Sequence, residues 1–443
     1  MSAAIQKNSP TLVEMPPELV SQIVMTKDFK GRHILDAADV SNIRLASRRM
    51  NAKSFHDFAG RFFTIRRHVV NAASFKCIQE ISQDPNFSSY VREVSFVPLR
   101  INYPLGDTHY CPLKDWYPVF GDAYQALIEE QEAFDRSKGN SGIITEALSA
   151  FPNLGKIRIE AYPSEINYAG WQAWGTKTTF RKIGIFPYPE ETEWSRVHNS
   201  LIDQKGQEPA NICAHYQIIV DALGSLSAQK NSQNWTLDIA LLMICRDDRI
   251  QLFDLSSQNF LRIRDRIQSI YLNATMGIYD SNWRIDGPWL RKYLEVRPGI
   301  VSLTLDQESA PSEYLMWLRL DNIRRFELLS CDVAPKYVGR FLKRHSNTLK
   351  SIRICHVLLW DEWDSTDISW SDIFELMMCM PHLNAIDLCS LEPHSGIPDN
   401  DDLEHMKVLE CQVGSETMIA RGREVVRALH STIEAKMDMH LKK

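Results

Sequence analysis

The chain has 443 residues, of which 44% are hydrophobic and 24% charged, and its net charge is −6. This balance is typical of a folded globular protein, and the length fits one small module followed by one large or elongated domain. The acidic net charge argues against a general nucleic-acid-binding surface, and no apolar run approaches the roughly 20 residues that a membrane helix needs. We therefore expect neither nucleic acid nor a membrane as a partner.

The residue types that carry enzyme chemistry show no recognised local pattern. The nine cysteines form neither Cys-x-x-Cys pairs nor a zinc-like spacing with histidines. The sequence also lacks a nucleophile elbow, a P-loop, a dinucleotide fingerprint and a His-Glu-x-x-His motif. Its polar start has no signal-peptide core. We predict a protein of the cytoplasm or nucleus that is not an enzyme, with no catalytic residues, metal or cofactor, whose thiols stay reduced and mostly buried.

The first part of the chain indicates a small helical module after a disordered lead-in over residues 1–10. A helix start is expected at Pro16 and Pro17, because a proline in the first turn loses no helical hydrogen bond. A second helix is expected from Asp39, a suitable N-cap. Short helices within residues 11–60 bury too little apolar surface to be stable alone, so they should pack on something else. The apolar positions at helical spacing are Leu19, Val20, Ile23 and Val24 in the first helix, and Val40, Ile43, Leu45 and Met50 in the second.

Residues 61–443 alternate helix-period segments with short apolar strands. Each strand follows the template apolar-x-x-apolar-x-apolar, which is also found in leucine-rich repeats. The predicted fold class is therefore α/β, with an irregular leucine-rich-repeat-like solenoid whose parallel sheet carries helices on its other side. The expected strands lie at 91–96, 154–159 and 237–242 and near residues 300, 323, 349 and 383; the best expected helices lie at 335–345 and 371–380; and Leu349, Ile352 and Ile354 are expected to be buried.

Two stretches of the helical module resemble the two halves of an F-box. The first is Leu12-x-x-Met15-Pro16-Pro17-Glu18-Leu19-x-x-x-Ile23, and the second runs from Asp39 to Met50 as Asp-Val-Ser-Asn-Ile-Arg-Leu-Ala-Ser-Arg-Arg-Met. In F-box proteins the second half reads Asp-Leu-x-x-Leu-x-Leu-Val-Cys/Ser-Arg/Lys-x-Trp. The chain as a whole resembles the fungal F-box proteins with irregular leucine-rich repeats.

This resemblance implies a substrate-recognition adaptor of an SCF cullin-type ubiquitin ligase. The F-box would bind a Skp-type linker protein, and through it a cullin, while the repeat domain would bind a protein target. Two alternatives stay open: an interaction scaffold whose helices only cap the solenoid, and an enzyme with a dispersed site. By the resemblance, the linker would contact Leu12, Met15, Pro16, Pro17, Leu19 and Ile23, and the helical surface or its support would be completed by Val40, Ile43 and Leu45.

Two departures from the F-box pattern bear on linker binding. The spacer between Pro16 and Asp39 is longer than usual, with residues 27–32 as the expected insertion. That insertion either loops out or lengthens the first helix, and a longer helix would spoil the docking surface. In addition, Met50 stands where the family has tryptophan.

An acidic loop with tryptophans, between Val357 and Ser369, is the candidate target contact. Clustered acids are tolerated where they stay solvated or meet a cationic partner, and tryptophan adds apolar area and a surface for cation–π contact. The sequence therefore predicts that this loop recognises a basic segment of the target, with a solvated connector as the alternative. The candidate contact residues are Trp360, Asp361, Glu362, Trp363 and Asp364.

Overall fold

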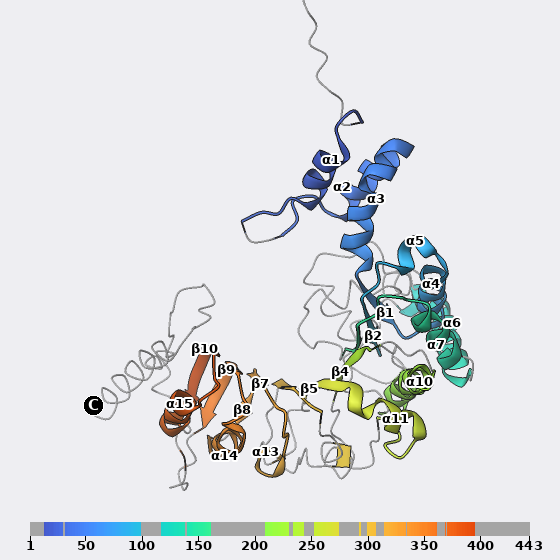
Figure 1. The fold of residues 1–443 in the computed structure, drawn as a ribbon. Coiled ribbons are helices and arrows are strands. Elements are labelled where there is room, and N and C mark those ends of the chain that lie inside the picture. The colour runs from blue at the N-terminus through green and yellow to red at the C-terminus, as the bar shows by residue number, and fades with distance from the viewer. Residues whose placement is uncertain are drawn as a thin grey trace, which may run out of the picture.

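A computed structural model gives the fold of the chain (Figure 1). It describes residues 13–29, 32–98, 117–137, 140–160, 209–229, 234–242, 252–273, 292–293, 299–306, 314–333, 335–360, 368 and 370–394. The described helices are α1 (Pro17–Met25), α2 (Ala37–Ala46), α3 (Arg48–Phe63), α4 (Ala72–Gln83), α5 (Pro85–Ser88), α6 (Tyr117–Arg136), α7 (Asn140–Ser149), α10 (Pro209–Ser227), α11 (Gln258–Ile263), α13 (Tyr314–Trp317), α14 (Pro335–His345) and α15 (Trp370–Cys379). The described strands are β1 (Ile65–Val69), β2 (Glu93–Val97), β3 (Lys156–Ile159), β4 (Thr236–Leu242), β5 (Ile267–Asn273), β6 (Ser302–Asp306), β7 (Arg325–Leu329), β8 (Asp332–Val333), β9 (Ser351–Trp360) and β10 (Ala385–His394).

The strands form one sheet whose order follows the chain, from β1 to β7 and then β9 and β10, with the short β8 beside β9. All pairings among these strands are parallel. Parallel neighbours need a crossover connection, which places the connecting helices against the sheet. In Figure 1 the strands follow an arc, and α4, α7, α10, α11, α14 and α15 lie along its outer side. The predicted α/β class with a parallel sheet is confirmed.

The core between sheet and helices contains an apolar ladder that runs from strand to strand. Residues at one register position are all apolar and buried, each with at most 8% of its surface exposed. Because each side chain is covered by the equivalent residue of the next strand, one unit hides its apolar face only when its neighbours are present. The ladder consists of Phe96, Ile159, Ile239, Ile270, Leu303, Phe326, Ile352 and Ile386.

The elements expected in the C-terminal part of the chain are confirmed. β6, β7, β9 and β10 lie side by side in parallel, close to the four predicted starts. α14 occupies the predicted range 335–345, and α15 begins one residue before the predicted start at 371. Leu349, Ile352 and Ile354 are fully buried. The template therefore identifies these strands because its apolar positions are the ones that face the helices.

The strand β5 is missing from the sequence-based expectation, although Ile267, Ile270 and Leu272 satisfy the same template. The helix in front of it, α11, has only six residues and passes through a short 3-10 turn into the strand. A helical period cannot be recognised over so few residues, and the expected units were those with a clear helix in front of the strand.

The two first helices begin close to their expected positions, with one correction at α2. α1 follows Pro16 and has Pro17 in its first turn, as predicted. α2 is capped by Asp36 rather than by the predicted Asp39. The Asp36 carboxylate accepts from the backbone N–H of Asp39, and the Asp39 carboxylate accepts from the N–H of Asp36. This reciprocal capping box satisfies two backbone N–H donors, whereas a single capping side chain satisfies only one.

The long spacer loops out and leaves α1 short. α1 ends at Met25, and the chain then turns back through an antiparallel bridge between Lys27 and His33. The backbone N–H of Ile34 donates to the carbonyl of Thr26 at 3.0 Å, which closes the turn. Of the two outcomes considered for the insertion, the looped-out one is confirmed.

The helical module joins the sheet domain through α3. This helix continues to Phe63, past the domain boundary expected after residue 60, and leads directly into β1. The ring of Phe63 stacks on that of Phe87 in α5 with centroids 4.2 Å apart, and Phe55 contacts the same ring at 5.4 Å. Aromatic packing therefore fixes the module to the first helices of the sheet domain.

The described cysteines are not all reduced thiols. Cys77 and Cys331 are buried and free, as predicted. Cys355 on β9 is disulfide-bonded, so the prediction of reduced thiols is wrong at this position. The strand register places Cys389 of β10 directly beside it. Such neighbourhoods depend on strand pairing, which the spacing of cysteines along the chain does not reveal.

Candidate functional site

Exposed large apolar side chains concentrate in the N-terminal helical module. Among the described residues, six of the eight such side chains lie between residues 19 and 45. Exposed apolar side chains gathered in one short stretch of chain are candidates for an interaction site, and these six come from α1, the spacer and α2. The six side chains, together called the apolar surface below, are Leu19, Ile23, Met25, Phe29, Ile34 and Leu45.

Several residues predicted to contact a linker belong to this surface or flank it. Leu19 and Ile23 of α1 are 45% and 36% exposed, and Leu45 near the end of α2 is 83% exposed. Pro16 and Pro17 are also exposed at the start of α1. Leu12 lies outside the described residues.

Three other predicted residues lie beneath the surface. Val40 is fully buried in a small core with Val20 and Val24, and Met15 and Ile43 pack against that core from its margin. Val40 therefore supports the apolar surface and does not belong to it, which is the second of the two roles predicted. Met50 completes the same core, so the side chain at this position supports the exposed face and is not part of it.

Polar contacts with α3 hold the segments around the apolar surface in place. The Lys53 ammonium donates to the carbonyls of Val13, at 2.8 Å, and Met15. The Ser21 hydroxyl donates to the Asp57 carboxylate at 3.0 Å, which ties α1 to α3. Contacts with backbone carbonyls therefore fix the chain that enters α1 against α3.

The second helix and the spacer are anchored by two arginines. Arg44 of α2 lies over the ring of Phe58 at 3.6 Å, and its Nε donates to Asn51 at 2.9 Å. Arg61 donates to the carbonyl of Leu35 at 2.6 Å, at the end of the spacer. Partial burial lowers the pKa of both guanidinium groups. These contacts keep α2 and the spacer against α3 while leaving the apolar side chains outside.

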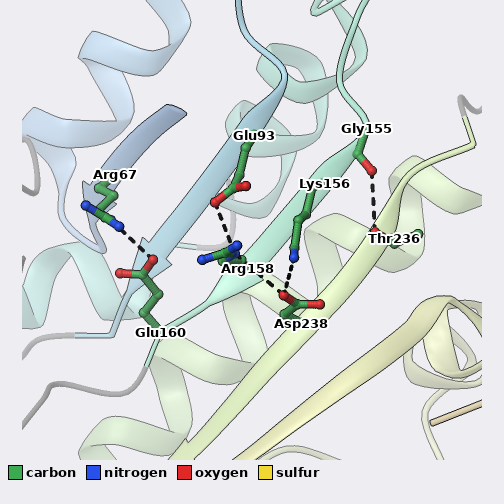
Figure 2. Close-up of polar contacts among 8 residues, drawn as sticks. All are labelled: Arg67, Glu93, Gly155, Lys156, Arg158, Glu160, Thr236 and Asp238. Carbon is green, nitrogen blue, oxygen red and sulfur yellow. Dashed lines mark hydrogen bonds and ion pairs between the residues drawn. The ribbon is translucent and has the colours of Figure 1, made fainter. Parts of the chain in front are cut away.

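A second feature lies on the sheet face that no described helix covers. Figure 2 shows charged side chains of β1, β2, β3 and β4, and of Glu160 directly after β3, that pair across the strands. Lys156 and Asp238 are 2.6 Å apart, and Arg158 lies 3.0 Å from Glu93 and 3.6 Å from Asp238. The whole group, called the balanced cluster below, has three cations and three carboxylates: Arg67, Lys156, Arg158, Glu93, Glu160 and Asp238, with Arg67 and Glu160 paired at 3.3 Å.

Sequence reasoning missed both the charged sheet face and half of the apolar surface. The charged residues occupy the positions between the apolar ones of the strand template, so alternation alone could have placed them opposite the helices. Met25, Phe29 and Ile34 escaped notice because they lie at or beyond the end of α1, in the insertion and spacer.

One buried histidine–carboxylate pair bears on the enzyme alternative. His215 of α10 lies 2.9 Å from Asp135 of α6, the distance of a general base and its orienting acid. The His215 side chain is 0% exposed, however, so the ring cannot meet a substrate in this conformation. The pair locks two helices together. Among the described residues, no group of three or more His, Cys, Asp or Glu side chains is arranged to hold a metal ion.

The predicted acidic target loop lies almost wholly outside the described residues. β9 ends at Trp360, and residues 361–364 follow it.

In the part of the chain that the structure describes, no helix combines the length and the apolar character needed to cross a membrane. No protein-family model matches the chain, and no curated protein matches it.

Proposed function

We propose that the chain is the substrate-recognition adaptor of an SCF cullin-type ubiquitin ligase. Its N-terminal helices form an F-box-like module that binds a Skp-type linker, and its α/β domain is an irregular leucine-rich-repeat-like solenoid that binds a protein target. The observation that carries this proposal is the apolar surface on a module otherwise held together by its own small core.

Burial of that surface against partner helices supplies the binding energy. Full burial of one Leu or Ile side chain contributes about 1.5–3 kcal/mol. Leu19 and Ile23 are four residues apart on α1 and so lie on one face of the helix. Leu45 adds an almost fully exposed side chain from α2. Apolar anchors of this kind, presented on a rigid support, are typical of helix-mediated docking.

The sheet domain supports the target-binding half of the proposal. Its helices lie along one side of the arc, and the opposite face presents polar and charged side chains (Figures 1 and 2). Stacked repeats commonly bind partners on such an extended face. The domain would contribute proximity, by raising the concentration of target lysines near the ubiquitin-charged enzyme. The loop from Trp360 to Asp364 remains a proposed target contact, and the cytoplasm or nucleus the proposed location.

An interaction scaffold without a ligase partner is the second candidate. The stacking of Phe63 on Phe87 places the helical module at the β1 end of the sheet, as a terminal cap of a repeat array would be placed. A cap, however, requires an apolar face toward the repeats and a polar face toward water, whereas this module exposes apolar side chains.

Capture of a recombinant Skp-type linker by the full chain tests the proposal. Replacing Leu19 and Ile23 by Asp forces charge into the proposed contact and should weaken capture by at least about tenfold. The matched control replaces Ile65 and Met316, which are 49% and 37% exposed but lie outside the module, by Asp. Equal capture by both double variants would exclude the apolar surface as the docking site. A wild-type chain that captures no linker would leave the scaffold as the better function.

A further inference from the structure

Four cationic side chains gather where β7 and β9 begin. The backbone N–H of Lys350 donates to the carbonyl of Arg324 at 2.7 Å, so these two residues lie in adjacent turns. Arg325 follows at the start of β7, and Arg353 lies two positions further along the sheet on β9. All four side chains are exposed. We call this group the basic corner: Arg324, Arg325, Lys350 and Arg353.

The basic corner carries an excess of positive charge. Arg325 pairs with Glu327 at 3.1 Å, and Arg353 pairs with Asp387 at 3.1 Å. Among the described residues, Arg324 and Lys350 contact no carboxylate. Four cations against two carboxylates leave an excess of two positive charges, in a chain whose net charge is −6.

The two ion pairs also present their positive ends to solvent. The side chains of Arg325 and Arg353 are 61% and 44% exposed, whereas those of Glu327 and Asp387 are 15% and 21% exposed. Each carboxylate contacts the Nε of its arginine. Both guanidinium groups are therefore partly open to solvent, and a guanidinium held in this way can still bind a carboxylate through its planar fork.

Ordinary helix chemistry explains the cations nearby but not Arg324 and Lys350. Lys343 and Arg344 lie in the last turn of α14, where the helix dipole favours positive charge. Arg344 also donates to carbonyls near α13, and burial followed by the charge of Arg319 lowers its pKa. Arg324 and Lys350, by contrast, lie in the turns that precede strands, and neither donates its side chain to a described neighbour.

Among the described residues, the equivalent turns elsewhere in the sheet carry no second pair of adjacent cations that both lack a carboxylate contact. Backbone hydrogen bonds link these turn positions from one strand to the next. The link between Arg324 and Lys350 joins two cations without a described carboxylate contact, whereas Lys156, whose N–H donates to the Arg92 carbonyl, is paired with Asp238 at 2.6 Å. Adjacent like charges destabilise a sheet in the absence of a partner. The linked positions are Arg92 with Gly155 in the N-terminal half, and Gln268, Val301, Arg324, Lys350 and Asn384 in the C-terminal half.

We propose that the basic corner binds an acidic segment of the target protein, through Asp and Glu side chains of that segment. The proposal rests on the target-binding role of the sheet domain and names the chemistry of its ligand. Adjacent strands lie about 4.8 Å apart, and alternate residues along a strand about 6.6 Å apart, so the four cations are spread over the surface. Separated carboxylates along an extended chain fit such a spread better than one compact phosphate group does.

Fluorescence anisotropy with the full chain and a fluorescein-labelled peptide of alternating Glu and Gly residues tests this proposal. Replacing Arg324 and Lys350 by Glu should weaken binding at low salt by at least about tenfold, while a matched Gln and Gly peptide should not bind. The control variant carries Arg92→Glu and Lys76→Glu, which change the net charge equally at exposed positions of the N-terminal half. Its affinity should stay within about twofold of the wild type.

Several outcomes would overturn the proposal. These are absence of wild-type binding, an equal loss in the control variant, and a clear preference for a phosphoserine peptide of the same total charge. Circular dichroism checks the fold of each variant, and Arg324→Gln with Lys350→Gln replaces the Glu pair if that pair does not fold. The titration needs no linker protein, so a failed linker capture and a failed peptide titration are separate results.

Discussion

The balanced cluster and the two ion pairs of the basic corner lie on the same sheet face and use the same residue types, yet their charges are arranged differently. In the balanced cluster, three cations meet three carboxylates, and Asp238 bridges two of the cations. In the basic corner, each paired carboxylate serves one arginine, and two further cations lie beside the pairs. The first arrangement satisfies its charges within the chain, and the second leaves some of them for a partner.

This difference separates structural from recognition roles on one surface. A half-buried carboxylate that bridges two cations holds strands together, and loss of Asp238 would leave Lys156 without a carboxylate and Arg158 with Glu93 alone. Exposed cations without a carboxylate partner add little to stability and raise the potential that an anionic ligand meets. Each of the following predictions changes a charged or titratable residue of the sheet domain and compares it with a matched position.

The largest expected effect concerns a charge on the buried side of the same sheet. His68 of β1 follows Arg67 and is fully buried, with Nδ1 3.0 Å from the Ser74 hydroxyl. Burial, and secondarily the charge of Arg66, lowers the pKa of His68 from 6.5 to about 3. As pH falls below 6.5, the unfolded chain takes up a proton at this residue and the folded chain does not. The folded state therefore loses stability progressively between pH 6.5 and about 3.

Between pH 7 and pH 4 this single residue should cost about 3 kcal/mol of unfolding free energy. Urea unfolding of His68→Gln at several pH values should show a correspondingly flatter pH dependence than the wild type. His56→Gln, at an exposed position of α3, serves as the control for replacing a histidine by glutamine. If the unfolding free energy of His68→Gln had the same pH dependence as that of the wild type, the folded chain would be shown to accommodate a protonated His68.

The next effect compares two aspartates of equal exposure. The side chains of Asp238 and Asp387 are both 21% exposed, but Asp238 meets Lys156 and Arg158, whereas Asp387 pairs with Arg353 alone. We expect Asp238→Asn to lower the free energy of unfolding by about 2 kcal/mol, because Lys156 loses its carboxylate and Arg158 keeps Glu93 alone. Asp387→Asn should cost about 0.5 kcal/mol, as for an exposed pair. Urea denaturation measures both, and equal losses would remove the distinction between the two regions.

The sequence predicted the parts of the fold that depend on local apolar spacing. β6, β7, β9 and β10 follow from their template because positions such as Leu349, Ile352 and Ile354 must all face the helices. β5 escaped because its preceding helix is too short to show a period. The capping residue of α2 was placed three residues late, since Asp36 and Asp39 both belong to one capping box.

The candidate sites were less predictable, because they depend on which side chains a fold leaves outside. Leu19, Ile23 and Val40 look alike in the sequence, and only the packing of α1 and α2 on α3 shows that Val40 is buried. The ion pairs of the sheet face join residues far apart in sequence, such as Arg158 and Glu93. Their pairing depends on strand register across long connections, which composition and spacing do not contain.

The smallest expected effect concerns the two unpaired cations of the basic corner. Replacing Arg324 and Lys350 by Gln removes a repulsion between adjacent like charges and no described carboxylate contact. The variant should therefore gain up to about 0.5 kcal/mol of unfolding free energy at low salt. At about 1 M salt the gain should vanish, because charges are then screened beyond about 3 Å. Urea unfolding at both salt concentrations measures this change. Arg92→Gln is the control, because the cation linked to Arg92, Lys156, is already paired with Asp238. A loss of stability at both salt concentrations would instead assign the two cations a structural role, and the corner would then resemble the balanced cluster.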